Sequence, residues 1–172
     1  MHCIQYIATK ADSAEEAHSD VKAYLENLMG EEGYGTWYDW FVTGGGRWST
    51  DDDPYNDNYT GDVVHQSSPK FQEYVDTASR FKQEELTRYI QNARKINLQD
   101  ILDLAEAGED DYFKVGHQLY EVKQIYEMTL GVWNYNSYFF DTVNDTTYKK
   151  YMLEAIDKGD KDWYLVPVDF HF

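Results

Sequence analysis

The chain has 172 residues and a mass of 20.3 kDa, a length that fits one compact domain with a sizeable hydrophobic core. Hydrophobic residues make up 42% of the sequence and aromatic residues 17%, which argues against a disordered acidic tail, because such tails are poor in aromatic side chains. The formal net charge of −17 argues against non-specific binding of nucleic acid, which requires many lysine and arginine side chains.

The sequence also bears on the cellular compartment. No apolar run reaches the roughly 18 to 20 residues that cross a bilayer, and the opening residues MHCIQYIATK lack the basic start and long apolar stretch of a signal peptide. The only cysteine, Cys3, can form neither an internal disulfide nor a thiolate zinc site. We therefore expect a cytoplasmic protein without a metal, a cofactor or a membrane partner.

The beginning of the chain predicts a strand followed by a helix. Residues 3–8 form an apolar run with β-branched and aromatic members, which is typical of a buried strand. Across 14–29, apolar residues recur every three or four positions. Ser13 provides an N-cap before this segment and Gly30 a stop after it, so we expect an amphipathic helix.

The middle of the chain predicts one more strand, a loop and two helices. Residues 37–43 (WYDWFVT) favour a strand, which three glycines end. Residues 51–62 contain many turn formers and no base, and indicate an exposed loop. Helical periodicity then extends over about 69–95, and a shorter helix is expected over 98–107.

The last third is read as mainly β-structure. The alternating residues around Gly116 predict a hairpin, and residues 138–143 predict a buried strand. Asp145 is expected to cap a helix that ends near residue 157. The final strand covers 163–172, and Pro167 indicates that it lies at a sheet edge.

This order predicts an α+β fold. Without the middle helices, the elements alternate as strand, helix, strand, twice over, which is the split β-α-β pattern of a ferredoxin-like sandwich. We therefore expect residues 1–172 to form a single domain, with a helical insertion at 63–108 between its two halves.

An aromatic and glycine-rich segment is the first candidate binding site. Its residues are Trp37, Trp40, Gly45, Gly46, Arg47 and Trp48. Indole rings stack on bases, a guanidinium binds phosphate or carboxylate, and glycines expose backbone N–H groups to an anion. In the alternative interpretation, the tryptophans build the core, the glycines form a tight turn, and Arg47 pairs with Asp39.

A polar cluster at the two chain ends is the second candidate site. In a ferredoxin-like sheet the first and last strands are antiparallel neighbours, which would place His2 beside His171. Asp169 shares a face with His171 because strand side chains alternate. Two imidazoles and a carboxylate provide acid-base groups, although terminal histidines are more often ordinary surface residues.

Other site types find little support. The segment that begins at Asn56 resembles the start of an EF-hand loop, but its twelfth position is Ser67 instead of a glutamate. No nucleophile motif is present, and Cys3 lies within an apolar run, where a thiol is expected to be inert. We assign no catalytic and no metal-binding residue.

The run from Trp37 to Trp48, with the opening MHCIQYIAT and the closing VPVDFHF, resembles a group of small uncharacterised bacteriophage proteins. Their shared signature reads approximately W-D-W-[YF]-x-x-G-G-R-[WF]. Tyr38 and Gly44 are additional residues relative to that signature. The resemblance implies a ferredoxin-like fold and a phage setting, with the host-cell cytoplasm as the location and anti-defence or host takeover as the context, but no established activity.

Three hypotheses about function follow. The first is a non-enzymatic protein that sequesters a small anionic, nucleotide-like ligand at the tryptophan and arginine segment. The second is an acidic inhibitor or nucleic-acid mimic that acts on a host enzyme. The third is a small hydrolase that uses His2, Asp169 and His171. The sequence favours binding over catalysis without deciding between them, and its surplus of aromatic residues is compatible with a homodimer.

Overall fold

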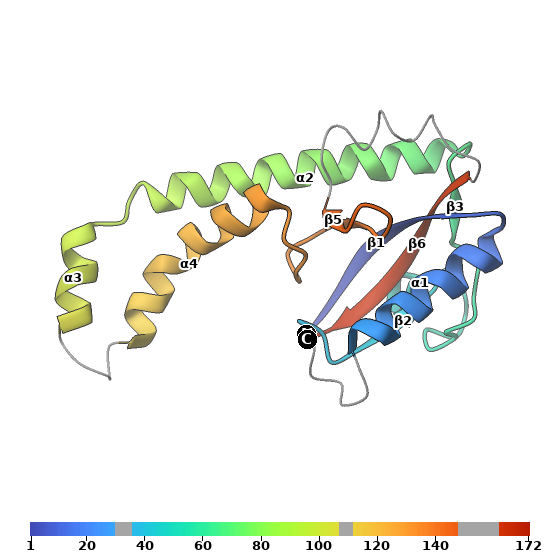
Figure 1. Cartoon of the computed structure of the whole chain (residues 1–172), viewed down its shortest axis with the longest axis horizontal. Helices are drawn as coiled ribbons and strands as arrows, with labels where there is room; N and C mark the ends of the chain where they lie inside the picture. The colour runs from blue at the N-terminus through green and yellow to red at the C-terminus, as the bar shows by residue number, and fades with distance from the viewer. Residues whose placement is uncertain (30–35, 107–111, 148–161) are drawn as a thin grey trace. The chain divides into compact units, whose positions relative to one another are not determined.

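A mixed sheet and a group of helices form two compact units in a computed structural model of the chain (Figure 1). The structure describes residues 1–29, 36–106, 112–147 and 162–172. The first unit, here called the sheet unit, comprises residues 1–79 and 133–172, and the second, the helical unit, comprises residues 80–132. The fold is therefore α+β, as the sequence predicts.

The sheet unit is built around two long strands from opposite ends of the chain. The strands are β1 (His2–Ala11), β2 (Trp40–Thr43), β3 (Val64–His65), β4 (Phe139–Asp141), β5 (Thr146–Thr147) and β6 (Asp162–His171). Their order is β2-β6-β1-β4-β5, and β3 also pairs with β6. β1 and β6 are antiparallel over their whole length, from the pair His2 and His171 to the pair Ala11 and Asp162.

In the first half of the sheet unit, two strands joined by a helix flank a third strand. β1 and β2 are both antiparallel to β6, which lies between them, and helix α1 (Ala14–Met29) connects the two. β4 pairs with β1 in the parallel direction, so the sheet is mixed. The described residues do not include a second unit of the same kind, and the ferredoxin-like arrangement is therefore not confirmed.

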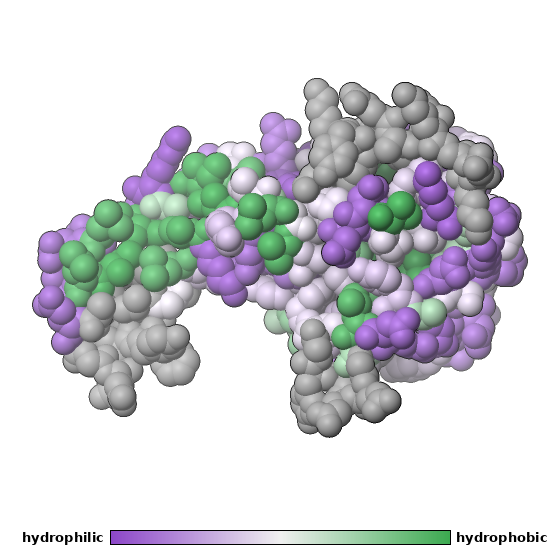
Figure 2. Space-filling model, viewed as in Figure 1, coloured by the Kyte–Doolittle hydropathy of each residue, from purple (hydrophilic) through white to green (hydrophobic). Residues whose placement is uncertain are grey.

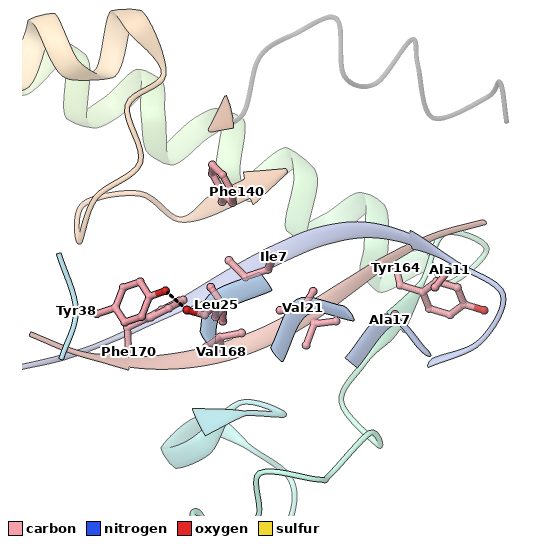
Figure 3. Packing of buried hydrophobic residues seen from close by; sticks show 11 residues of the cluster. Ile7, Ala11, Ala17, Val21, Leu25, Tyr38, Phe140, Tyr164, Val168 and Phe170 are labelled. Carbon is pink, nitrogen blue, oxygen red and sulfur yellow. Dashed lines mark hydrogen bonds between the residues drawn. The ribbon is translucent and has the colours of Figure 1, made fainter. Parts of the chain in front are cut away.

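One face of the sheet packs against α1. In Figure 3, side chains of α1 point toward apolar side chains of β1 and β6. Val21 and Leu25 of α1 are completely buried there, as are Ile7 and Phe170 of the sheet. The Tyr38 hydroxyl donates a hydrogen bond of 3.0 Å to the Leu25 carbonyl oxygen, so a polar group is satisfied within the core. Each such large apolar side chain contributes about 1.5–3 kcal/mol by burial.

The opposite face is covered in part by the beginning of α2 (Pro69–Ala93). Phe71, Val75 and Ala78 of this helix pack with Ala8, Leu165 and Trp163 of the sheet. These sheet residues lie at the end of β1 and the beginning of β6. Helix α2 therefore leaves the other end of this face, around His2 and His171, to other segments.

The helical unit contains the second half of α2, helix α3 (Leu98–Glu106) and helix α4 (Tyr112–Leu130). Tyr89 of α2 is buried and meets Tyr120 of α4 with ring centroids 6.2 Å apart. Asn92 donates a hydrogen bond of 3.3 Å to Glu121. Among the helices that the structure describes, none has the length and apolarity needed to span a membrane.

The predicted hairpin around Gly116 is wrong, because α4 is continuous from Tyr112 to Leu130. The sequence alternates there over a few residues only, and no proline or turn dipeptide follows. Glycine inside a helix costs only about 1 kcal/mol relative to alanine, which the packing of Tyr120 and Met128 offsets. The helical stretch thus extends beyond the predicted insertion at 63–108.

The predicted cap at Asp145 also needs correction. Asp145 has a positive φ of 48° and is followed by β5, which pairs with β4. A short polar residue tolerates this left-handed conformation in a tight turn. The remainder of the predicted helix lies outside the described residues.

Pro167 does not mark a sheet edge, since β6 has neighbours on both sides. Tyr6, its partner on β1, donates its backbone N–H to Tyr138, so the Pro167 nitrogen faces away from β1. On that other side β2 pairs with β6 only from Val168 onward and β3 only up to Leu165. The proline lies in the gap between them, where no donor is needed.

Two leucines of α1 test the core assignment. Leu25 is completely buried, whereas Leu28 is 37% exposed. We expect Leu25→Ala to lower the free energy of unfolding by about 2–5 kcal/mol, and Leu28→Ala by less than about 1 kcal/mol. Urea titration followed by circular dichroism measures both; equal losses would contradict the described packing of α1.

Candidate functional site

The three tryptophans of the aromatic segment lie in three different environments. Trp37 packs in the core, with its ring centroid 4.9 Å from that of Phe170. Trp40 stacks on His171 at 5.4 Å, at the end of β6. Trp48 is 48% exposed and lines a pocket. The structure therefore does not assemble the six predicted residues into one binding surface.

The glycines form a tight turn that approaches a buried carboxylate. Gly44, Gly45 and Gly46 all have positive φ values, between 51° and 97°. A Cβ at Gly46 would lie 2.4 Å from the Cβ of Asp169, so only glycine fits there. The turn leads into the short 3-10 helix η1 (Gly46–Trp48), where the Arg47 backbone N–H donates to Asp169 at 3.3 Å.

The Arg47 side chain is exposed, and its predicted partner is bound elsewhere. The Asp39 carboxylate forms a hydrogen bond of 2.5 Å with His171, in place of the suggested pair with Arg47. This hydrogen bond lowers the pKa of Asp39 below its ordinary value, and desolvation acts in the opposite direction. The contribution of Arg47 to the fold comes from its backbone.

The structure places the polar cluster of the chain ends together. His2 and His171 are paired across β1 and β6, with ring centroids 4.9 Å apart. His2 forms a hydrogen bond of 2.9 Å with Asp169, which is 1% exposed. Trp40 contacts both imidazoles. Two imidazole–carboxylate pairs, His2 with Asp169 and His171 with Asp39, thus meet at this end of the sheet.

The hydrogen bonds of this cluster stabilise the fold, whether or not the cluster has a chemical role. A buried carboxylate is costly unless hydrogen bonds satisfy it, and Asp169 receives them from His2 and from the Arg47 N–H. No group of three or more metal-ligating side chains suited to a metal ion occurs among the residues that the structure describes. The arrangement supplies two imidazoles for proton exchange and holds η1 against the sheet.

An open pocket of about 490 Å³ lies beside η1, on the face of the sheet that also carries His2 and Asp169. It is lined by Ile4, Tyr6, Trp48, Thr50, Gly61, Asp62, Val63, Val64, His65, Ser68, Lys70, Tyr74 and Pro167. Residues from β1 and β6 thus meet residues that follow η1 and residues from the first turns of α2. Its volume is within the range of small-molecule sites, which is about 300–1,000 Å³.

Three aromatic residues, Tyr6, Trp48 and Tyr74, belong to the apolar part of the pocket lining. Tyr6 and Tyr74 stack with centroids 4.1 Å apart. Burial, together with the neighbouring phenols of Tyr74 and Tyr138, raises the pKa of Tyr6 well above its ordinary value, so its hydroxyl stays protonated. Trp48 adds an indole that is half exposed. The pocket therefore offers planar apolar surfaces to a planar ligand.

The charged groups of the pocket differ in the hydrogen bonds and ion pairs that they form with the protein. Asp62 accepts hydrogen bonds from Ser49 and from the backbone and hydroxyl of Thr50. His65 contacts Ser67 through one ring nitrogen and Asp162 through the other. Lys70 is exposed and makes no ion pair with a residue that the structure describes. Among the described residues, no ion pair would therefore compete with a ligand for Lys70.

Of these pocket-lining residues, the sequence analysis names Trp48 as a candidate but not Tyr6, Tyr74 or Lys70. Tyr6 and Tyr74 belong to elements that the sequence predicts, yet their stacking depends on how α2 crosses the sheet. For Lys70, the sequence does contain a signal that could have indicated an anion-binding residue. It stands in the first turn of a 25-residue helix without an acid there, where the helix dipole disfavours a cation.

Glycine substitutions test the turn at η1. We expect Gly46→Ala to lower the free energy of unfolding by about 2 kcal/mol or more, because a left-handed φ adds to the close approach to Asp169. Gly116→Ala is the matched control. Nothing lies within 4 Å of a Cβ there, so this change should stabilise α4 by about 0.5–1 kcal/mol. Thermal unfolding of both variants decides; a neutral Gly46→Ala would contradict the described turn.

The reactivity of Cys3 tests its burial. Desolvation raises the pKa of the thiol to about 11, the charge of Asp169 adds to this, and a hydrogen bond from Gln5 opposes it. Because a higher pKa leaves less thiolate, iodoacetamide at pH 8 should alkylate folded Cys3 on the order of 100-fold more slowly than the urea-unfolded chain. The folded rate should rise about tenfold per pH unit up to pH 10. Equal rates in both states would contradict the prediction.

Comparison of the chain with protein-family models, with curated proteins and with solved structures gives no match. The candidate site therefore stands on its geometry: an aromatic pocket with the basic residue Lys70 in its lining, next to a polar cluster that positions η1.

Proposed function

We propose that this chain is a non-enzymatic binding protein that holds a small planar ligand with an anionic group, such as a nucleotide, in the pocket beside η1. The observation that carries the proposal is that Trp48, Tyr6, Tyr74 and the basic residue Lys70 line one pocket. Aromatic faces stack on a base or a similar ring, and an ammonium group binds phosphate.

The electrostatics of α2 support an anionic ligand. Helix α1 has Glu15 and Glu16 in its first turn, as the helix dipole favours, whereas the first turn of α2 contains Lys70 and no acid. Ser68 caps α2 through a hydrogen bond of 3.3 Å from the Lys70 backbone N–H. A bound anion would remove the unfavourable meeting of the cation with the positive end of the dipole.

The overall acidity of the protein does not exclude such a ligand. At physiological salt the Debye length is about 8 Å, so distant carboxylates are largely screened. The acid that lines the pocket, Asp62, already accepts hydrogen bonds from Ser49 and Thr50. The resemblance to phage proteins makes sequestration of a host nucleotide the expected setting.

Binding of nucleotides tests this function. We expect AMP or a dinucleotide to quench tryptophan fluorescence, and Trp48→Ala or Lys70→Gln to weaken binding at least about tenfold, because each removes one recognised group. Tyr55→Ala, at an aromatic residue that is 67% exposed, and Lys95→Gln are matched controls outside the pocket. The affinity of Arg47→Ala locates the anion: unchanged affinity indicates binding at Lys70, and reduced affinity indicates binding over η1. Absence of saturable binding for every nucleotide tested would contradict the proposal.

A second candidate function, an acidic inhibitor of a basic host protein, is favoured by where the charge lies. The sheet unit carries 22 acidic and 8 basic side chains, a net charge of −14. Capture of such a partner would weaken steeply with salt, since exposed charges attract through a screened field. Salt-insensitive capture would count against this alternative and leave the pocket as the site of function.

A further inference from the structure

Large apolar side chains are unusually exposed on the helical unit. They are Ile90, Leu98, Leu102, Leu119, Val122, Tyr126, Leu130 and Val132, each 36–74% exposed. Figure 2 shows apolar residues gathered over this part of the molecule. Single exposed apolar residues are ordinary, but a concentration of this kind on a unit of 53 residues marks an interaction surface.

Helix α4 has buried side chains on one side and exposed apolar side chains on the opposite side. Its inner side carries Gln124 and Met128, which are buried at 2% and 9% exposure. Its exposed side carries Leu119, Val122, Tyr126 and Leu130, at successive spacings of three, four and four residues. This spacing places them on one side of the helix and is typical of a helix that packs against another helix.

Helix α3 also exposes large apolar side chains. Leu98 and Leu102 are one turn apart and are 74% and 56% exposed. We call these two leucines and the exposed row of α4 the apolar seam: Leu98, Leu102, Leu119, Val122, Tyr126 and Leu130. With about 180 Å² for each fully exposed large side chain, the seam offers on the order of 600 Å² per copy. A stable dimer buries about 800 Å² per partner, including its polar rim.

The distribution of charge indicates which partner fits. Residues 80–132 contain 10 acidic and 7 basic side chains, a net charge of −3, while the rest of the chain carries −14. Two copies repel each other least through their helical units. The seam itself contains no charged side chain, so a second copy meets it without desolvating an ion.

We propose that the apolar seam of α3 and α4 binds the seam of a second copy and makes this chain a homodimer. A two-fold axis lets the same row of side chains serve both partners, as in isologous helical interfaces. The interface is independent of the pocket, because it uses no residue that lines it.

The oligomeric state of the full-length chain tests the proposal. Analytical ultracentrifugation should show a dimer at 50 µM, and Val122→Glu should weaken dimerisation at least 100-fold, because a carboxylate would be buried in an apolar interface. Val143→Glu is the matched control, since Val143 is 51% exposed and lies in the sheet unit. A wild-type monomer at 100 µM, or an undiminished dimer in Val122→Glu, overturns the proposal.

A crosslink provides a test that does not rely on destabilising the surface. In a Cys3→Ser background, Tyr126→Cys introduces the only thiol, in the middle of the α4 row. Mild oxidation should convert most of this variant to a disulfide-linked dimer at low micromolar concentration, whereas Tyr55→Cys in the same background should remain monomeric. Equal crosslinking of both variants would show random collision and overturn the assignment to the seam.

Discussion

The antiparallel pairing of β1 with β6 is the constraint on which the other features depend. It joins residues from the two ends of the chain in ten consecutive pairs, beginning with His2 and His171. Side chains alternate across a strand, so this register decides the face on which each residue lies. One face receives Ile7, Val168 and Phe170 and packs on α1. A shift by one residue would place the Asp169 carboxylate among these apolar groups, without its hydrogen-bond partners.

Asp169 connects the stability of the fold to the geometry of the pocket. Its carboxylate is buried and is satisfied by His2 from β1 and by the Arg47 backbone N–H from η1. The absence of a side chain at Gly46 permits that approach. Because Trp48 is the next residue of η1 after Arg47, the hydrogen bond to Asp169 also fixes where this indole enters the pocket. The glycines and arginine therefore act mainly through the backbone, and Trp48, Tyr6 and Tyr74 are the aromatic residues that line the pocket.

The two units of the molecule differ in net charge and therefore in the kind of ligand or partner that their surfaces favour. The sheet unit is strongly acidic, yet the lining of its pocket includes the basic residue Lys70 at the positive end of a helix dipole. The helical unit has a net charge of only −3 and exposes apolar side chains on α3 and α4. An anionic ligand and a second copy would thus use separate surfaces, each chosen by the local balance of charge and not by the total of −17.

The sequence by itself determined the α+β class, the capped helix α1, the long helix α2 and the terminal strands, because apolar periodicity and caps are local signals. It also predicted that His2 and His171 would be neighbours, which follows from pairing the first and last strands. It failed at Gly116, where a short alternation outweighed a helical pattern, and at Pro167, whose tolerance depends on a gap between β2 and β3. Only the tertiary structure decided that the tryptophans separate, that Asp169 holds η1, and that Tyr6, Tyr74 and Lys70 meet. These contacts join residues far apart in the chain, and local patterns contain no information on how α2 crosses the sheet.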